Sequence, residues 1–243
     1  MKTVFINCSS KKRFCASAYL MGLQRLFVRG RHVTERLRGK QDHGRILQAL
    51  LDADAVVFCL PLYVDGLPSH VLPFLQALEG FCRENKRSLR VYSISNNGFI
   101  EGRQSEPLLQ VFRNFCARSG LDWGGGIGVG GGVMLNVTRI LFLVQAGLLL
   151  LNVVLSGVQS GDFFPVAALE NFAVQSGVLL FLNAGVLLAV FRMGRAINKG
   201  GFFGKSYTRI LVPSFVFILF ADIFFVIVSI FQGGAFRGWL AKK

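Results

Sequence analysis

Three long runs without charged residues constrain this chain more than any other feature. Residues 140–157 and 172–191 are almost entirely apolar, and residues 210–231 are interrupted only by Asp222. A helix of about 20 apolar residues crosses the roughly 30 Å hydrocarbon core of a bilayer. One such run is compatible with a buried core helix, but three in the second half of one chain favour membrane spans. We therefore predict an α-helical transmembrane region of about three spans, at about 137–157, 172–191 and 210–231.

The charges between the runs predict their orientation. The connection 192–209 is rich in Lys and Arg, whereas the only charged residues of the connection 158–171 are Asp162 and Glu170. Short basic loops stay on the cytoplasmic side. We therefore expect a multi-pass protein of the cell membrane whose N-terminal domain lies in the cytoplasm. Three full spans would put the basic C-terminal tail outside, against this rule, so a re-entrant or interfacial third segment is the alternative.

Asp222 lies near the middle of the third run. An ionisable side chain inside a span is costly, and it normally faces a partner or water. One interpretation is a proton or quinone site. The other is a packing hydrogen bond to Asn152, to Asn183 or to a neighbouring hydroxyl.

The first half of the chain alternates between strand-like and helix-like segments. Apolar strands are expected at 3–7, 55–61, 89–95 and 121–131, and helices at 17–27, 45–54, 68–85 and 105–120. The polar segment 30–42 should hold a weak or edge strand. Alternation of this kind predicts an α/β fold with a doubly wound parallel sheet. We place this domain at 1–132 and the transmembrane helical domain at 133–243.

A doubly wound sheet binds ligands at the carboxyl ends of its strands. The first such loop, 8–17, combines hydroxyls, free backbone N–H groups and three consecutive cations at the start of a helix. This composition suits a phosphate group. The alternative is a solvated basic loop.

Two further loops follow buried strands. The loop 61–68 has Tyr63 and apolar residues at positions where polar turn residues are usual. A planar apolar ligand that binds there would account for this composition, and so would a Tyr that caps the core. The loop 96–102 offers two Asn amides and a Gly. These could bind the edge of a heterocycle, although Asn-Asn-Gly is also an ordinary turn.

Together the three loops resemble the flavodoxin-like NAD(P)H-dependent FMN reductase family over about residues 1–130. The most specific part is 53–64, where Ala53 to Phe58 match an AD-x-[IV]-[IV]-F pattern and Pro61 to Val64 match P-x-Y-[WFV]. The resemblance implies bound FMN as cofactor and NAD(P)H as substrate. It implies that the FMN phosphate is held by Ser9, Ser10, Lys11, Arg13 and Ser17. It also implies that the flavin ring lies against Pro61, Leu62, Tyr63, Val64, Asn96, Asn97, Gly98 and Phe99.

The sequence departs from the family in three places. Ser10 or Lys11 occupies the position at which the phosphate loop of the family usually has a Pro, and the second strand is shortened. The last amphipathic helix of the family is not visible, and the first span takes its place. The glycine run 124–132 lacks the acidic residue of a dinucleotide fold. It indicates close backbone packing, a hinge before the membrane, or a glycine-lined edge of the flavin pocket.

Other classes of function are disfavoured. The five cysteines form no C-x-x-C pair, so no metal site is expected. The net charge of +14 includes a basic segment at 25–45, but aromatic interleaving is absent, so anionic lipid headgroups explain it better than nucleic acid.

We therefore expect a membrane-anchored flavoprotein oxidoreductase. It would use FMN to pass reducing equivalents from NAD(P)H to a quinone, a flavin or another membrane-associated acceptor. Its partners would be the lipid bilayer and a quinone or protein redox partner, and a homodimer is compatible with the sequence. No catalytic side chain is assigned, because the flavin carries the chemistry. The alternative is a non-enzymatic membrane protein whose flavodoxin-like domain is a scaffold or redox sensor.

Overall fold

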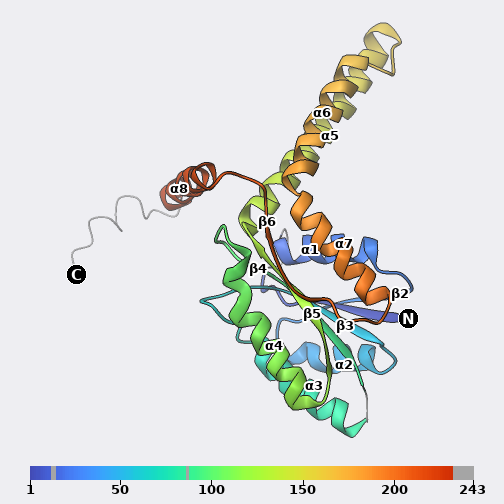
Figure 1. The fold of residues 1–243 in the computed structure, drawn as a ribbon. Helices are drawn as coiled ribbons and strands as arrows, with labels where there is room; N and C mark the ends of the chain where they lie inside the picture. Colours follow the sequence, from blue (N-terminus) through green and yellow to red (C-terminus); the bar gives the residue numbers. More distant parts are fainter. Residues whose placement is uncertain (12–14, 86–87, 232–243) are drawn as a thin grey trace, which may run out of the picture. The chain divides into compact units, whose positions relative to one another are not determined.

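The computed structural model describes residues 1–11, 15–85 and 88–231 (Figure 1). Within the α8 helix, the side chains of residues 224, 228 and 231 are also outside the description. The chain divides into two compact units, Met1–Ile210 and Leu211–Lys243, and each is described by itself.

The first unit is built on a parallel sheet. Its strands are β1 (Lys2–Asn7), β2 (Arg31–Arg36), β3 (Ala55–Pro61), β4 (Arg90–Asn96), β5 (Asp122–Gly130) and β6 (Gly204–Arg209). The strand order in the sheet is β2-β1-β3-β4-β5-β6, with every neighbouring pair parallel. The first five strands have the flavodoxin-like order 2-1-3-4-5. The predicted doubly wound α/β fold is therefore confirmed.

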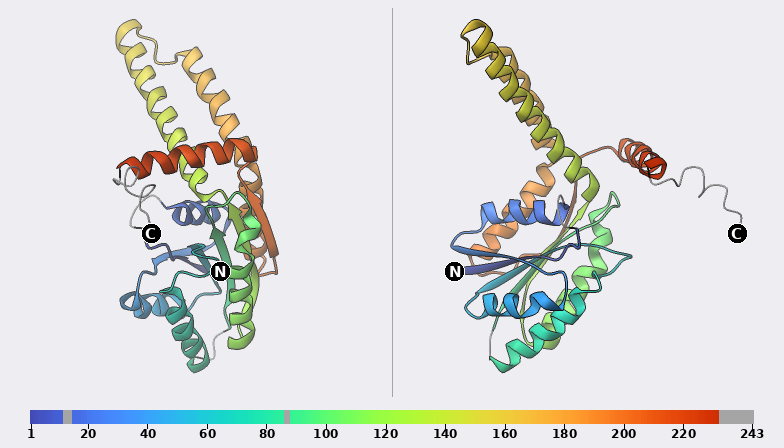
Figure 2. Two further views of the ribbon diagram at one scale, coloured as in Figure 1. Left: turned by 90° about the vertical axis from the view of Figure 1, so that its left-hand side faces the viewer. Right: turned by 180° about the vertical axis from the view of Figure 1, so that it is seen from behind.

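Helices cover both faces of this sheet (Figures 1 and 2). One face carries α1 (Ala16–Phe27) and α7 (Ala184–Asn198); the other carries α2 (His43–Leu50), α3 (Val71–Glu84) and α4 (Glu106–Ser119). Short 3₁₀ turns at Lys40–Asp42 and Gly102–Ser105 precede α2 and α4. β3 is buried along its whole length, and its Phe58 ring lies 5.0 Å from that of Phe112. An apolar strand covered on both sides is typical of a central parallel strand.

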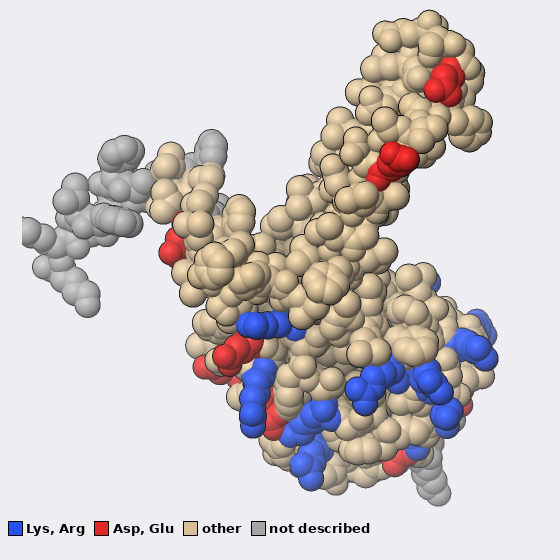
Figure 3. Space-filling view, turned by 45° about the horizontal axis from the view of Figure 1, so that its top comes forward, with Lys and Arg blue, Asp and Glu red and all other residues tan. Residues whose placement is uncertain are grey.

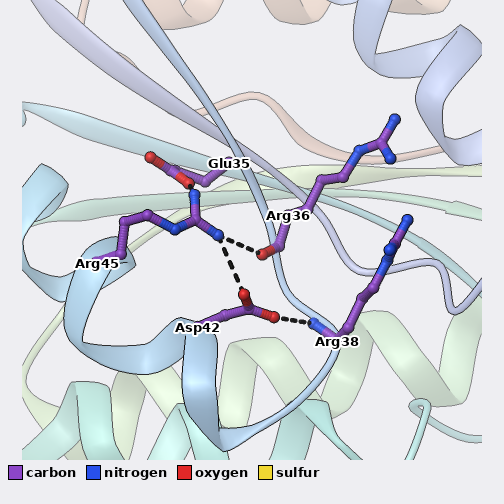
Figure 4. Close-up of polar contacts among 5 residues, drawn as sticks. All are labelled: Glu35, Arg36, Arg38, Asp42 and Arg45. Atoms are coloured by element: carbon purple, nitrogen blue, oxygen red, sulfur yellow. Dashed lines mark hydrogen bonds and ion pairs between the residues drawn. The ribbon is translucent and has the colours of Figure 1, made fainter. Parts of the chain in front are cut away.

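The polar segment 30–42 forms the edge strand β2, as its composition predicts. Arg45 of α2 holds this edge: it forms an ion pair with Glu35, lies 3.1 Å from the Asp42 carboxylate and donates to the carbonyl of Arg36 (Figure 4). The other Asp42 oxygen accepts from the backbone N–H of Arg38 at 2.8 Å. One cation of the basic segment 25–45 is thus paired with carboxylates at the edge of the sheet.

A helical hairpin extends from the end of β5 (Figures 1 and 2). Its arms are α5 (Gly132–Ser160) and α6 (Val166–Leu182). Beyond its first two turns α5 is exposed and apolar, and its 29 residues make it the one described helix that alone is long and apolar enough to cross a membrane. The first predicted span, 137–157, lies within α5.

The predicted second span is not one straight helix. Residues 172–191 cross a break at Asn183, where α6 ends and the chain bends by 65° into α7. Asn183 donates its side-chain amide to the carbonyl of Leu179, and α7 then packs along α1. Buried Val190 accepts a hydrogen bond from buried Gln24 of α1 at 3.1 Å.

α7 is an amphipathic helix that covers the sheet, and it corresponds to the last amphipathic helix that was not visible in the sequence. Its buried residues follow helical spacing, whereas Arg192 and Arg195 stay exposed. The expectation that the first span takes the place of this helix is wrong, because the hairpin is inserted before the helix instead. The connection 192–209, expected as a loop, forms the end of α7 and strand β6.

The glycine run forms strand β5, and neighbouring segments pack closely against its backbone. A Cβ on Gly125 would lie 2.3 Å from the carbonyl oxygen of Gly204 in β6, and one on Gly130 would lie 2.1 Å from that of Ile100. Glycines therefore allow β6 and the loop after β4 to pack against β5. The compact unit consequently runs to Ile210, beyond residue 132, where the sequence analysis placed the domain boundary.

The second unit contains α8 (Ser214–Phe231), an apolar helix on which Asp222 is exposed. A third span at 210–231 and a role for Asp222 both stay predictions.

Candidate functional site

Three loops meet at the carboxyl ends of β1, β3 and β4 around a cavity of about 190 Å³. The cavity lies at the β1/β3 switch point, where the chain changes direction across the sheet. Of the predicted site residues, those that line it are Ser9, Lys11, Ser17, Pro61, Leu62, Tyr63, Asn96, Asn97 and Gly98. The topology therefore brings together residues that are widely separated in the sequence.

The first loop leaves β1 in a tight polar turn. The side-chain oxygen of Asn7 accepts from the backbone N–H of Ser9 at 3.0 Å, and the Ser9 hydroxyl accepts from that of Lys11 at 3.4 Å. Ser9 is buried, whereas Ser10 and Lys11 are exposed and available to an anion. Arg13, predicted to hold the phosphate, lies outside the described residues.

Ser17 is fully buried in the first turn of α1. Its hydroxyl donates to the side-chain oxygen of Asn96 at 2.8 Å. In this structure it therefore joins the first loop region to the third and sets which way the Asn96 amide faces.

The second loop contains a strained turn. Tyr63 and Gly66 bond to each other through both backbone groups, and the two residues between them, Val64 and Asp65, have φ values of 46° and 57°. A positive φ is ordinary for Asp in a turn, but it is a true outlier for a β-branched residue. The Val64 side chain is completely exposed, at 101 %, so no packing within the described structure compensates for the strain.

Tyr63 does not cap the core, since it is 42 % exposed. Its hydroxyl lies 3.3 Å from the Ser10 hydroxyl, so the first and second loops touch at their exposed ends. Pro61 and Leu62 are buried beneath this contact.

The third loop presents an unsatisfied amide. The Asn97 side-chain nitrogen donates to the carbonyl of Glu101 and to the Ser105 hydroxyl, at 3.1 and 3.2 Å. These two bonds identify the other end of the amide as the carbonyl oxygen, which is buried and finds no hydrogen-bond partner among the described residues. Gly98 lines the cavity, whereas the Phe99 ring is 60 % exposed and lies outside its lining.

The fourth side of the cavity comes from a helix that the sequence analysis assigned to the membrane. Gly132, Val133 and Asn136, in the first turns of α5, line it. The glycine run allowed for a glycine-lined edge of a flavin pocket, and Gly132 lines this cavity. Val133 and Asn136 were missed because they adjoin an apolar run with no local sign of a site.

Two buried cysteines, Cys8 and Cys59, lie at the carboxyl ends of β1 and β3. Burial raises the pKa of the Cys8 and Cys59 thiols above their ordinary value. Cys15 lines the cavity and accepts a weak hydrogen bond from the Asn7 amide. Among the described residues, no group of His, Cys, Asp and Glu is arranged to hold a metal ion.

These features define a site for a particular kind of ligand. Hydroxyl groups and the Lys11 ammonium line one side, the exposed Tyr63 ring lines another, and buried amide oxygens lie inside. Such a set suits an anionic molecule that carries a planar ring with hydrogen-bond donors at its edge. The predicted site residues Ser10 and Val64 are exposed and lie outside the lining of the cavity.

Comparisons with known proteins give no family assignment. No family model and no curated protein matches this chain. Among solved structures, it is similar to the Trp repressor binding protein from Bacillus subtilis, at 18% identity and a TM-score of 0.45, over 53% of this chain and 84% of that one. It is also similar to a protein titled NADPH-quinone reductase from P. pentosaceus, at 13% identity and a TM-score of 0.44, over 56% of this chain and 94% of that one. A flavone reductase matches at 9% identity and a TM-score of 0.47, over 84% of this chain and 66% of that one.

Proposed function

We propose that this protein is a membrane-anchored flavoprotein oxidoreductase that binds FMN. The observation that carries the proposal is the cavity at the β1/β3 switch point, where the exposed Lys11, the Tyr63 end of a strained turn and buried amide acceptors converge. When bound, FMN supplies hydride and electron transfer, and the protein contributes binding and orientation.

The residues present fit this cofactor. Ser10 and Lys11 are exposed in the loop after β1, and their hydroxyl and ammonium groups suit the phosphate. Tyr63 and Val64 offer apolar surface to a planar ring. The buried oxygen of Asn97 has no donor within the described part of the chain, and the N–H group at the edge of an isoalloxazine ring would supply one.

The exposed hairpin supports the membrane part of the proposal. None of the most apolar stretch of α5 is buried in the fold, and water-soluble monomers rarely expose apolar surface of this extent. The hairpin shows acidic side chains but no basic ones along its length in Figure 3, whereas Lys and Arg gather on the globular part near its base. The acidic residues of the hairpin are Asp162 and Glu170.

We propose that this hairpin crosses the membrane twice, with the sheet on the cytoplasmic side. Its two arms start and end at the sheet, so the basic residues 192–209 also remain on that side, as the positive-inside rule requires. Anionic lipid headgroups would then face the cations of the globular part.

NAD(P)H is the proposed electron donor, and the acceptor is a quinone or another membrane-associated molecule. The position of the cavity at the root of α5 supports an acceptor that approaches along the membrane.

Purification in a mild detergent tests the function. We expect a yellow protein, or a colourless one that quenches the fluorescence of added FMN, and we expect NADH or NADPH to bleach the bound flavin without oxygen. Riboflavin, which lacks the phosphate, is the matched control and should bind more weakly. Failure to bind FMN would overturn the proposal and would favour a non-enzymatic scaffold or sensor.

A further inference from the structure

The root of the hairpin is tied to the cavity by backbone hydrogen bonds. The N–H of Gly132 donates to the carbonyl of Asn97 at 2.7 Å, and that of Gly131 donates to the carbonyl of Phe99 at 2.6 Å. A Cβ on Gly132 would lie 2.9 Å from both the Asn96 amide nitrogen and the Asn97 carbonyl oxygen. The third loop and the first turn of α5 therefore form one packed unit.

The same root is also held from the side by α1. Leu135 and Thr138 are buried, at 0 % and 8 % exposure, and the Arg139 guanidinium lies 5.7 Å from the centre of the Tyr19 ring. No residue of α5 beyond Thr138 is buried. Its first two turns thus belong to the globular fold, and a side chain there is held in place before any ligand arrives.

Asn136 lies one turn after Gly132 and lines the cavity. Its side-chain oxygen is buried and has no hydrogen-bond partner among the described residues. A buried acceptor without a donor costs about 1–3 kcal/mol. The neighbouring Asn97 oxygen is in the same state, so two buried acceptors border one cavity.

We propose that Asn136 is a cofactor-binding residue contributed by the hairpin helix, and that its side-chain oxygen accepts a hydrogen bond from the bound flavin. This inference rests on the proposed function, because the flavin is the donor that it invokes. Its consequence is that the helix that enters the membrane also forms part of the cofactor pocket.

The test compares FMN affinity and stability in two variants. Asn136→Ala removes the acceptor, whereas Asn152→Ala changes an exposed Asn of the same helix whose amide bonds to the carbonyl of Leu148. The dissociation constant is measured by quenching of FMN fluorescence, and stability of the FMN-free protein by thermal unfolding in detergent. We expect FMN to bind about tenfold more weakly to Asn136→Ala and with unchanged affinity to Asn152→Ala.

Unfolding of the FMN-free protein separates binding from a merely structural role. Since the Asn136 oxygen has no hydrogen-bond partner among the described residues, its removal should leave the unfolding temperature unchanged or raise it. Weaker FMN binding together with lower stability of the FMN-free protein would indicate a structural role and overturn the assignment, and so would wild-type FMN affinity. A wild-type protein that binds no FMN would overturn the proposed function and this assignment together.

Discussion

Replacement of Val64 by Asn should make the protein more stable and weaken its hold on FMN. Val64 has a φ of 46° and is completely exposed, so its backbone is strained while its side chain contributes no packing. The left-handed conformation costs a non-glycine residue about 1–2 kcal/mol. Asn adopts this conformation readily, so we expect Val64→Asn to raise the free energy of unfolding by about 1 kcal/mol. Val64→Gly should gain less, because glycine loses about 0.5–1 kcal/mol more backbone entropy on folding.

The assay is thermal or chemical unfolding of the FMN-free protein. A gain of about 1 kcal/mol corresponds to a rise of roughly 2–4 °C in the melting temperature. Asp65→Asn is the matched control, since Asp65 has a φ of 57° in the same turn and both residues tolerate it. We expect no change for this control.

The affinity for FMN should move in the opposite direction. If Val64 covers the flavin ring, the loss of its apolar surface should weaken binding by roughly tenfold, since burial of a Val side chain contributes about 1.5 kcal/mol or more. A Val64→Asn variant no more stable than the wild type would refute the strain argument. A more stable variant with unchanged FMN affinity would refute the role of Val64 in the site.

Three further predictions concern packing, pH and topology. Gly194→Val should destabilise the fold by about 1–3 kcal/mol in chemical unfolding, because a Cβ there would lie 2.6 Å from that of Phe27, whereas Gly44→Ala has open space and should not. Burial raises the pKa of the Cys8 and Cys59 thiols above the ordinary value of 9.0, and that of Cys116 to about 12. When the pH rises above 9.0, these thiols therefore lose their protons in the unfolded chain before they lose them in the folded protein. Stability should therefore be flat below pH 9 and fall above it, by up to about 1.4 kcal/mol per pH unit and thiol, and replacement of the three cysteines by Ala should flatten this slope. Finally, in intact cells a membrane-impermeant maleimide should label Asp162→Cys at the hairpin tip but label Asp65→Cys only after lysis; labelling of both from one side would contradict the crossing.

Much of the fold and of the site follows from local patterns. The apolar run 55–61 and the Pro61 to Val64 loop identify a central strand and the loop that follows it from ten adjacent residues. The carboxyl ends of parallel strands meet at one edge, so the three loops were expected to converge once the alternation of strands and helices was recognised. The polar edge strand β2 was likewise readable from composition.

The remaining features depend on contacts between distant segments. Residues 172–191 are almost entirely apolar, yet the first part is exposed on the hairpin and the second packs against α1. The sequence does not separate the two parts, because hydropathy does not distinguish lipid from a neighbouring helix. β6 has the sequence of a polar loop, and only pairing with the glycine-rich β5 makes it a strand.

The sequence by itself determined an apolar membrane-type segment, a doubly wound sheet and three candidate ligand-binding loops after its strands. Only the tertiary structure decided that the hairpin is inserted before the last sheet-covering helix and that its root closes the cavity at Asn136. The physical reason is that periodicity and composition report which side chains avoid water, whereas the partner that shields them is chosen by packing across the whole fold.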